Sequence, residues 1–228
     1  SDTGSVTLTG KPQIAFDSVA TVSSTTTVSD TTINFSSASE TIMVAAGIGS
    51  RTTVDSDQAP AFTFNNPTQL LTLNAGDTGN DVINVAGLGT GFSADLTLNG
   101  QAGNDTLNIA GDINLGAGTL SINTETVNFN ATVAAPNLTV NATTVDQTGS
   151  VIVSGIATFN ATTVTLQNAN NNFASVNITA AAATLVDVDG IDLGTVTLSG
   201  ALNLTAGGNV TDSGPLTITG TTTIAAGS

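Results

Sequence analysis

Short segments of alternating apolar and polar residues recur along the chain, and Gly, Asn, Asp or Pro separates each from the next. Examples are TVTL at 195–198, ALNL at 201–204 and TTTI at 221–224. In a β-strand such alternation places one set of side chains inside and the other outside. Apolar residues at helical spacing are nearly absent, so the pattern predicts an all-β fold.

The alternating segments return at nearly constant spacing. VNATTV at 140–145 returns as FNATTV at 159–164, and Gly-Asn-Asp at 79–81 returns at 103–105. Equal spacing in sequence separates three further segments, VNI at 176–178, VTL at 196–198 and LTI at 216–218. A unit of this length cannot bury its inner face alone, whereas stacked units can.

The repeat therefore predicts a right-handed parallel β-helix, a β-solenoid with rungs of about 19–25 residues. A β-sandwich is the alternative, but its strands would not recur at constant spacing. We expect residues 1–39, which are strand-prone but lack the period, to form a cap or assembly segment. Residues 40–228 would form the solenoid, with Gly-Asn-Asp loops at 73–111 and regular rungs at 138–228.

The amino-acid composition excludes several kinds of partner and site. The net charge is −15, with Lys11 and Arg51 as the only cations, so we expect neither a nucleic-acid partner nor insertion into a membrane. No apolar run approaches a membrane span. Without Cys, disulfides and zinc-thiolate sites are excluded. Strand-forming residues and a hydrophobic fraction of 39% argue against disorder.

The two Gly-Asn-Asp loops are the candidate metal site. Residues one rung apart stack in a parallel solenoid, so we expect Asp81 near Asp105, with Asn80, Asn84 and Gly79 near their own counterparts. Stacked Asn side chains can form amide ladders, and a cation between stacked carboxylates would relieve their repulsion. The candidate calcium ligands are Asp77, Gly79, Asn80, Asp81, Gly103, Asn104 and Asp105.

The order Gly-x-Asp-x-apolar in these loops resembles the calcium-binding nonapeptide of RTX-type proteins. The match is partial, because the first glycine pair is incomplete and the two copies are more widely spaced than in that family. The alternative is that Asp and Asn form solvated β-turns here. A weaker acidic cluster is Asp187, Asp189 and Asp192, in which alternation would place the first two on one face.

No catalytic arrangement stands out. The chain has no His or Cys, so nucleophilic pairs with those residues are impossible, and it has no Trp or Tyr to line a sugar subsite. We therefore expect no enzymatic activity. Alternatives are an ice-binding or carbohydrate-binding module, but the Thr ranks are interrupted, and Phe62, Phe64, Phe129 and Phe159 alternate as core residues do.

Residues 171–200 and 200–227 resemble the repeats of filamentous-haemagglutinin-like adhesins and related giant secreted bacterial proteins, and residues 39–85 resemble further segments of them. This resemblance implies an extracellular or cell-surface location and a role in adhesion, matrix or filament structure, with a surface or matrix glycan as a partner.

The chain begins at Ser1 and stops in mid-pattern, so we expect a piece of something longer. Unpaired strand edges at solenoid ends also predict end-to-end self-association or continuation of the same chain.

Overall fold

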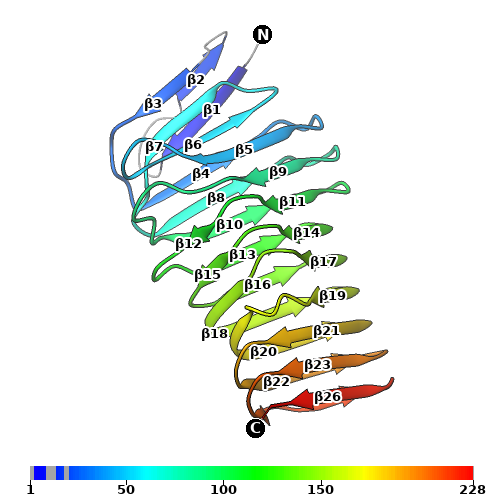
Figure 1. Ribbon diagram of the computed structural model, residues 1–228. Coiled ribbons are helices and arrows are strands. Elements are labelled where there is room, and N and C mark those ends of the chain that lie inside the picture. The colour runs from blue at the N-terminus through cyan, green and yellow to red at the C-terminus, as the bar shows by residue number, and fades with distance from the viewer. Residues whose placement is uncertain (1–2, 9–13, 18–20, 228) are drawn as a thin grey trace.

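The computed structural model describes residues 3–8, 14–17 and 21–227, with side chains from residue 21 onward. Within this part the chain is all-β, without a helix, and its strands stack into a β-solenoid (Figure 1). The chain alternates between two long sheets as it coils, so successive rungs lie side by side. The predicted fold class, an all-β parallel β-solenoid, is confirmed. No helix of the described residues is long and apolar enough to cross a membrane.

The first sheet has 14 strands, and in several rungs two of them, such as β15 and β16, pair with different halves of one longer strand. From β4 onward its neighbouring strands are parallel. Its strands are β1 (Thr3–Leu8), β2 (Ile14–Asp17), β4 (Asp30–Asn34), β8 (Leu70–Asn74), β10 (Asp95–Asn99), β12 (Ile113–Asn114), β13 (Leu120–Asn123), β15 (Val133–Ala135), β16 (Leu138–Asn141), β18 (Val151–Asn160), β20 (Asn172–Ala180), β22 (Ile191–Leu198), β24 (Val210–Asp212) and β25 (Leu216–Ile218).

The second sheet has 12 strands. Its strands are β3 (Thr21–Ser24), β5 (Thr41–Ala46), β6 (Arg51–Ser56), β7 (Ala61–Asn65), β9 (Val82–Val85), β11 (Thr106–Ile109), β14 (Thr126–Phe129), β17 (Thr144–Gln147), β19 (Thr163–Leu166), β21 (Ala182–Asp187), β23 (Leu202–Ala206) and β26 (Thr222–Ala226).

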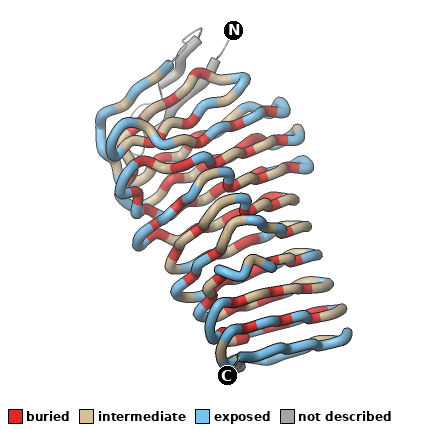
Figure 2. Tube along the Cα trace, in the orientation of Figure 1, coloured by how far each residue is buried: buried red, intermediate tan, exposed pale blue. Residues whose placement is uncertain are grey.

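Burial alternates residue by residue along the strands, as Figure 2 shows by colour. In β10, for example, Leu96 and Leu98 are buried and Thr97 between them faces outward. The inward side chains of both sheets form one continuous hydrophobic core. The prediction that four phenylalanines belong to the core is confirmed, since all four are buried: Phe62, Phe64, Phe129 and Phe159.

Rung length varies with the loops between the strands. Leu70 pairs with Asp95, whereas Leu120 pairs with Leu138, so the second of these rungs is clearly shorter than the first. Strand pairing confirms two of the predicted steps. One is the step from 140–145 to 159–164, and the other is the step between the two Gly-Asn-Asp loops.

One predicted step is wrong. The constant spacing places Val196 one rung after Val176, but Val196 pairs with Ile178 and Val176 pairs with Leu193. The rung that begins in β20 is therefore shorter than predicted. Between the two pairs β22 also has one residue more than β20, which is a β-bulge. A constant period anticipates neither the short rung nor the bulge.

The N-terminal end differs from the rest of the stack. β1 pairs antiparallel with β2 and with β4, and β6 pairs antiparallel with both β5 and β7. β4 already belongs to the parallel stack, because it pairs with β8 across a long interval of sequence. The β6–β7 insertion accounts for that long interval. Parts of the expected 1–39 segment, including Lys11, lie outside the described residues.

Candidate functional site

Asparagine side-chain amides form a ladder along the C-terminal ends of strands in the first sheet. Nδ2 of Asn99 donates to Oδ1 of Asn74 at 2.7 Å, and Nδ2 of Asn123 donates to Oδ1 of Asn99 at 2.7 Å. Because each amide occupies the last position of its strand, the parallel register aligns them all. The full ladder comprises Asn34, Asn74, Asn99, Asn123, Asn141 and Asn160.

A shorter amide ladder lies on the second sheet. Nδ2 of Asn108 donates to Oδ1 of Asn84, and Nδ2 of Asn128 donates to Oδ1 of Asn108, both at 2.9 Å. The predicted stacking of Asn84 on Asn108 is therefore confirmed. In both ladders, outward-facing asparagine side chains form hydrogen bonds between neighbouring rungs. These hydrogen bonds supplement those of the backbone.

Acidic residues form a third column, just before the strands of the second sheet begin. The N–H of Glu40 donates to Oδ1 of Asp81 at 2.7 Å, and the N–H of Asp81 donates to Oδ1 of Asp105 at 2.8 Å. The N–H of Asp105 in turn donates to Oε2 of Glu125 at 2.8 Å. Asp81 and Asp105 are fully buried, so their carboxylates serve as acceptors for backbone groups inside the corner.

In two residues of this acidic column, only one of the two carboxylate oxygens accepts a hydrogen bond. Among the described residues, Oδ2 of Asp81 and Oδ2 of Asp105 are buried without a hydrogen-bond partner. Gly100 packs so closely that a Cβ there would lie 2.5 Å from Oδ2 of Asp105. The backbone of the same rung therefore occupies the space beside this oxygen.

The surroundings of the acidic column shift its proton equilibria. Burial raises the pKa of Asp81 and of Asp105, because removal from water disfavours the charged form. The backbone hydrogen bond that each accepts acts in the opposite direction and lowers the pKa. Neighbouring carboxylates raise it again: Asp105 acts on Asp81, and Glu125 acts on Asp105. The net effect for both residues is a pKa above its ordinary value.

The structure stacks the two Gly-Asn-Asp loops as the sequence predicted. The N–H of Asn104 donates to Oδ1 of Asn80 at 2.9 Å, and a Cβ on Gly103 would overlap the carbonyl oxygen of Gly79. The positive φ angles of the two glycines, 109° and 155°, suit residues without a side chain. Asp77 lies exposed in the first loop.

These loops do not bring several carboxylates together on one side. Asp81 and Asp105 turn into the corner, whereas Asp77 remains in the exposed loop. Among the described residues, no group of three or more His, Cys, Asp or Glu is arranged to hold a metal ion. Calcium binding by the two loops stays a prediction.

The weaker acidic cluster is split by the end of β21. Asp187 is buried, and its Oδ2 accepts the N–H of Phe173 at 2.7 Å, while Asp189 is exposed beyond the strand. The prediction that these two residues share a face is therefore wrong, because the strand ends before the alternation reaches Asp189. Burial raises the pKa of Asp187, whereas the hydroxyl of Ser213 lowers the pKa of Asp192.

An open polar cavity of about 400 Å³ lies at the corner between the long amide ladder and the acidic column. It offers amide and hydroxyl groups and one carboxylate, but its lining contains no cation and no aromatic ring. The lining residues are Asn99, Gln101, Asn123, Thr124, Glu125, Asn141, Ala142 and Thr143.

Sequence reasoning missed Glu40 and Glu125 as members of the acidic column. The signal was present, because each acid lies two residues before an inward apolar residue. Glu125 precedes Val127 just as Asp105 precedes Leu107. The same alternation turns Glu40 and Glu125 toward the interior, where Glu40 is buried and Glu125 is half-buried.

Comparison with known proteins gives one family. Residues 116–180 and 179–228 match a family described as repeats of unknown function (DUF5649). The two matches overlap at 179–180, so the rungs from β13 to β26 are covered by two successive matches to one kind of repeat. No curated protein and no solved structure matched the chain.

Proposed function

We propose that the chain is a non-enzymatic structural rod, a segment of a bacterial surface adhesin or of a self-assembling filament outside the cell. The observation that carries this proposal is continuity: strand pairing and the buried core run from rung to rung, and the long amide ladder joins six of them. Because each rung contacts only its neighbours, such a stack keeps its shape at any length.

A structural role also suits the acidic residues. Asp81, Asp105 and Asp187 are buried, and each accepts a backbone N–H from a neighbouring strand or loop. Carboxylates used in this way hold the chain in place and are not free to take part in acid–base chemistry on a bound substrate. This supports a rod in which acidic groups serve the fold.

The extracellular location in this proposal rests on the resemblance of the sequence to giant secreted adhesins, while the similarity to a repeat family supports the repeat architecture. The net charge of −15 favours solubility and keeps neighbouring rods apart in solution. As part of the proposal, rods of this kind join end to end or continue within a longer chain, and display a surface to cell or matrix glycans.

Labelling of intact source cells tests the location. Antibodies raised against residues 1–228 should stain unpermeabilised cells or detect the protein in the medium. Antibodies against a cytoplasmic protein, applied to the same cells, provide the control for membrane integrity. Staining that appears only after permeabilisation, with no protein in the medium, would contradict the extracellular assignment.

A further inference from the structure

Two open cavities adjoin at the corner where the chain passes from the first sheet to the second. One is the polar cavity of about 400 Å³ between the long amide ladder and the acidic column. The other, of about 240 Å³, lies nearer the N-terminal end and is lined in part by Asn34, Phe35, Asn74 and Asp77. Gln101 lines both cavities, so together they form one groove, the corner groove, which follows the amide ladder from β4 to β16.

Ladder amides in the wall of the corner groove keep hydrogen-bonding capacity for a ligand. A side-chain amide can donate two hydrogen bonds and accept two. Within the ladder, Asn99 and Asn123 each donate one and accept one, so each keeps one N–H and one lone pair. Both side chains are only half-buried. Because a hydroxyl group also donates and accepts, a ligand rich in hydroxyl groups matches these amides.

Gln101 has a backbone conformation that residues with a side chain rarely adopt. Its φ angle is 74°, and every other positive φ among the described residues belongs to a glycine. Strained residues of this kind gather at sites that hold a ligand. The side chain of Gln101 is exposed, and its Nε2 donates to Oδ1 of Asn74 at 3.2 Å. An amide thus stands at the junction of the two cavities, within reach of a ligand in either.

Charge and one aromatic ring narrow the chemical class of ligand. The corner groove contains the carboxylates of Asp77 and Glu125, and its lining within the described residues has no Lys or Arg. Phosphorylated, sulfated or carboxylated ligands would therefore be repelled. Phe35 is half-buried in the second cavity and offers an aromatic face beside the polar groups, against which the C–H face of a sugar ring can pack.

An extended peptide suits the corner groove less well than a sugar chain. Such a peptide typically binds by adding a strand to an unpaired sheet edge. The strands that border the groove, β8, β10 and β13, are each paired on both sides. The groove therefore offers side-chain amides, hydroxyls and a ring, but no free backbone edge.

We propose that the corner groove binds a neutral, linear, hydroxyl-rich glycan, and that Gln101 is a specificity-determining contact at its centre. The ladder amides bind hydroxyl groups of successive sugar rings, and Phe35 packs against one ring. This inference rests on the proposed function of a rod that displays a surface to cell or matrix glycans, and it names the site and the class of glycan.

An array that carries neutral, sulfated and carboxylated oligosaccharides together with uncharged peptides tests the inference on the full chain. Neutral linear oligosaccharides should bind, and the other probes should not. Isothermal titration with the tightest neutral oligosaccharide then gives a Kd. Gln101→Gly should weaken this binding about fivefold to tenfold, the effect of one lost hydrogen bond. Its melting temperature should not fall, because glycine adopts a positive φ without strain.

Gln69→Gly is the matched control for this variant. Gln69 is also an exposed glutamine, but it precedes the first residue of β8, at the opposite end of that strand from the ladder. The Kd should therefore stay unchanged in Gln69→Gly. A merely structural role of Gln101 would change the melting temperature and leave the Kd as it is.

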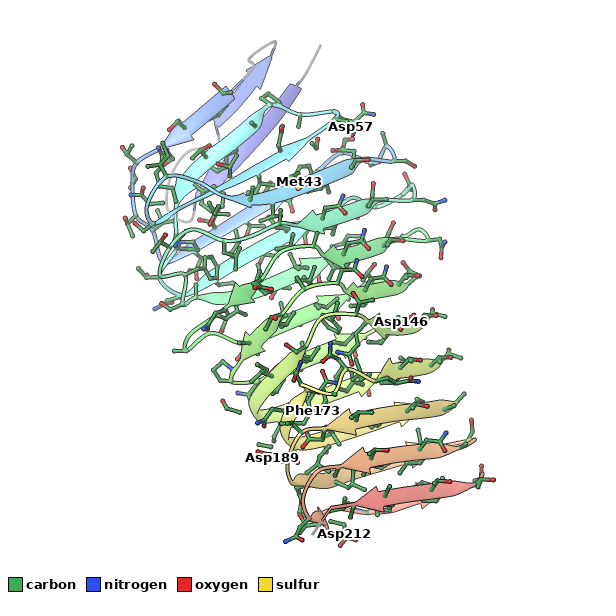
Figure 3. The ribbon with its side chains drawn as sticks, in the orientation of Figure 1. Met43, Asp57, Asp146, Phe173, Asp189 and Asp212 are labelled. Atoms are coloured by element: carbon green, nitrogen blue, oxygen red, sulfur yellow. The ribbon has the colours of Figure 1, made fainter. Side chains whose placement is uncertain are left out.

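A second variant tests the exclusion of acidic sugars. Glu125→Gln should increase the binding of carboxylated oligosaccharides, because it removes a negative charge from the corner groove. Asp146→Asn removes the same charge from an exposed position on β17 that lines neither cavity, and it should have no such effect (Figure 3). Circular dichroism of each variant verifies that the strands are intact.

Three outcomes would overturn the inference: no binding of any neutral oligosaccharide, preferential binding of acidic oligosaccharides or of peptides, or an unchanged Kd in Gln101→Gly. The array uses the purified chain and does not depend on where the protein resides. Cell-surface labelling is independent of these results, so failure of the corner groove and failure of the extracellular rod are distinguishable.

Discussion

The backbone N–H of Asp81 donates a 2.8 Å hydrogen bond to the carboxylate of Asp105, which lies 24 residues later in sequence and one rung further along the stack. A side chain thus takes the place that a carbonyl oxygen holds elsewhere in the ladder between rungs. The arrangement gives the backbone N–H a hydrogen-bond acceptor but buries two carboxylates. The free energy of unfolding therefore depends on the protonation of these carboxylates.

Stability should rise as the pH is lowered through the acidic range. The folded-state pKa values of Asp81 and Asp105 lie above the ordinary value of 3.8. Their contribution is therefore fully present below that value and is lost as the pH rises through the raised folded-state pKa. We expect a larger free energy of unfolding at about pH 4 than at about pH 8, measured by urea denaturation.

The double variant Asp81→Asn/Asp105→Asn should flatten this pH dependence, because neither amide titrates. Asp146→Asn, at an exposed position, serves as the control and should leave the slope nearly unchanged. If the double variant and the unmodified chain show the same slope, the buried pair is not its source.

Two glycine substitutions separate backbone strain from steric overlap. Gly91 has a φ of 71° and open space around it, so Gly91→Ala should cost only the left-handed conformation, about 1–2 kcal/mol. Gly103→Ala should destabilise the chain by more, because its Cβ would overlap the carbonyl oxygen of Gly79. Thermal unfolding of both variants gives the comparison, and equal losses would argue against tight stacking of the two loops.

In the long amide ladder, the loss of stability on substituting one asparagine should depend on its position in the ladder. Asn123→Ala removes two ladder hydrogen bonds, those to Asn99 and from Asn141, while Asn160→Ala at the ladder's end removes one. At about 1 kcal/mol for each bond, the free energy of unfolding should fall by about 2 kcal/mol and about 1 kcal/mol respectively. Urea unfolding measures both, and a larger loss at the end than in the middle would contradict a ladder that acts bond by bond.

Calcium binding by the Gly-Asn-Asp loops is tested most directly at Asp77, which is exposed and outside the buried column. If the loops bind calcium, adding it should raise the melting temperature relative to EDTA, because a ligand that binds only the folded state stabilises it. Asp77→Ala should reduce this rise, and Asp146→Ala should not. The absence of any calcium effect on the unmodified chain would exclude the site.

Removing one whole rung should leave a folded solenoid. Ala157 pairs with Val176, and Thr163 pairs with Ala182, so both sheets advance by the same interval at this point. Deletion of 157–175 therefore keeps inward residues inward and should preserve a cooperative thermal transition. Deletion of 157–165, which is not a whole rung, misaligns the faces and should abolish the transition. Similar behaviour of the two deletions would argue against independent stacking of rungs.

Much of the fold was accessible from the sequence because its causes are local. Alternation within a strand identified Phe129 and Phe159 as core residues, since side-chain direction follows from strand geometry alone. The repeated Gly-Asn-Asp motif identified the stacking of Asn84 on Asn108, because each asparagine follows its own copy of the motif at the same distance.

The long ladder and the acidic column were less accessible because their members are unequally spaced. Asn34 and Asn74 are 40 residues apart, and Asn123 and Asn141 only 18. The insertion at β6–β7 separates Glu40 from Asp81 in sequence while leaving them adjacent in the stack. An extra residue in β22 shifts the register after Leu193, and no periodic pattern reveals it.

By itself the sequence determined the alternation, the approximate rung period and the stacking of the Gly-Asn-Asp loops, because these follow from strand geometry and local spacing. Only the tertiary structure decided that the N–H of Glu40 donates to Asp81 and that the N–H of Asp105 donates to Glu125, which brings acids from distant strands into one column. Those relationships depend on pairing between distant strands, and the loop lengths and bulges along the chain set that pairing.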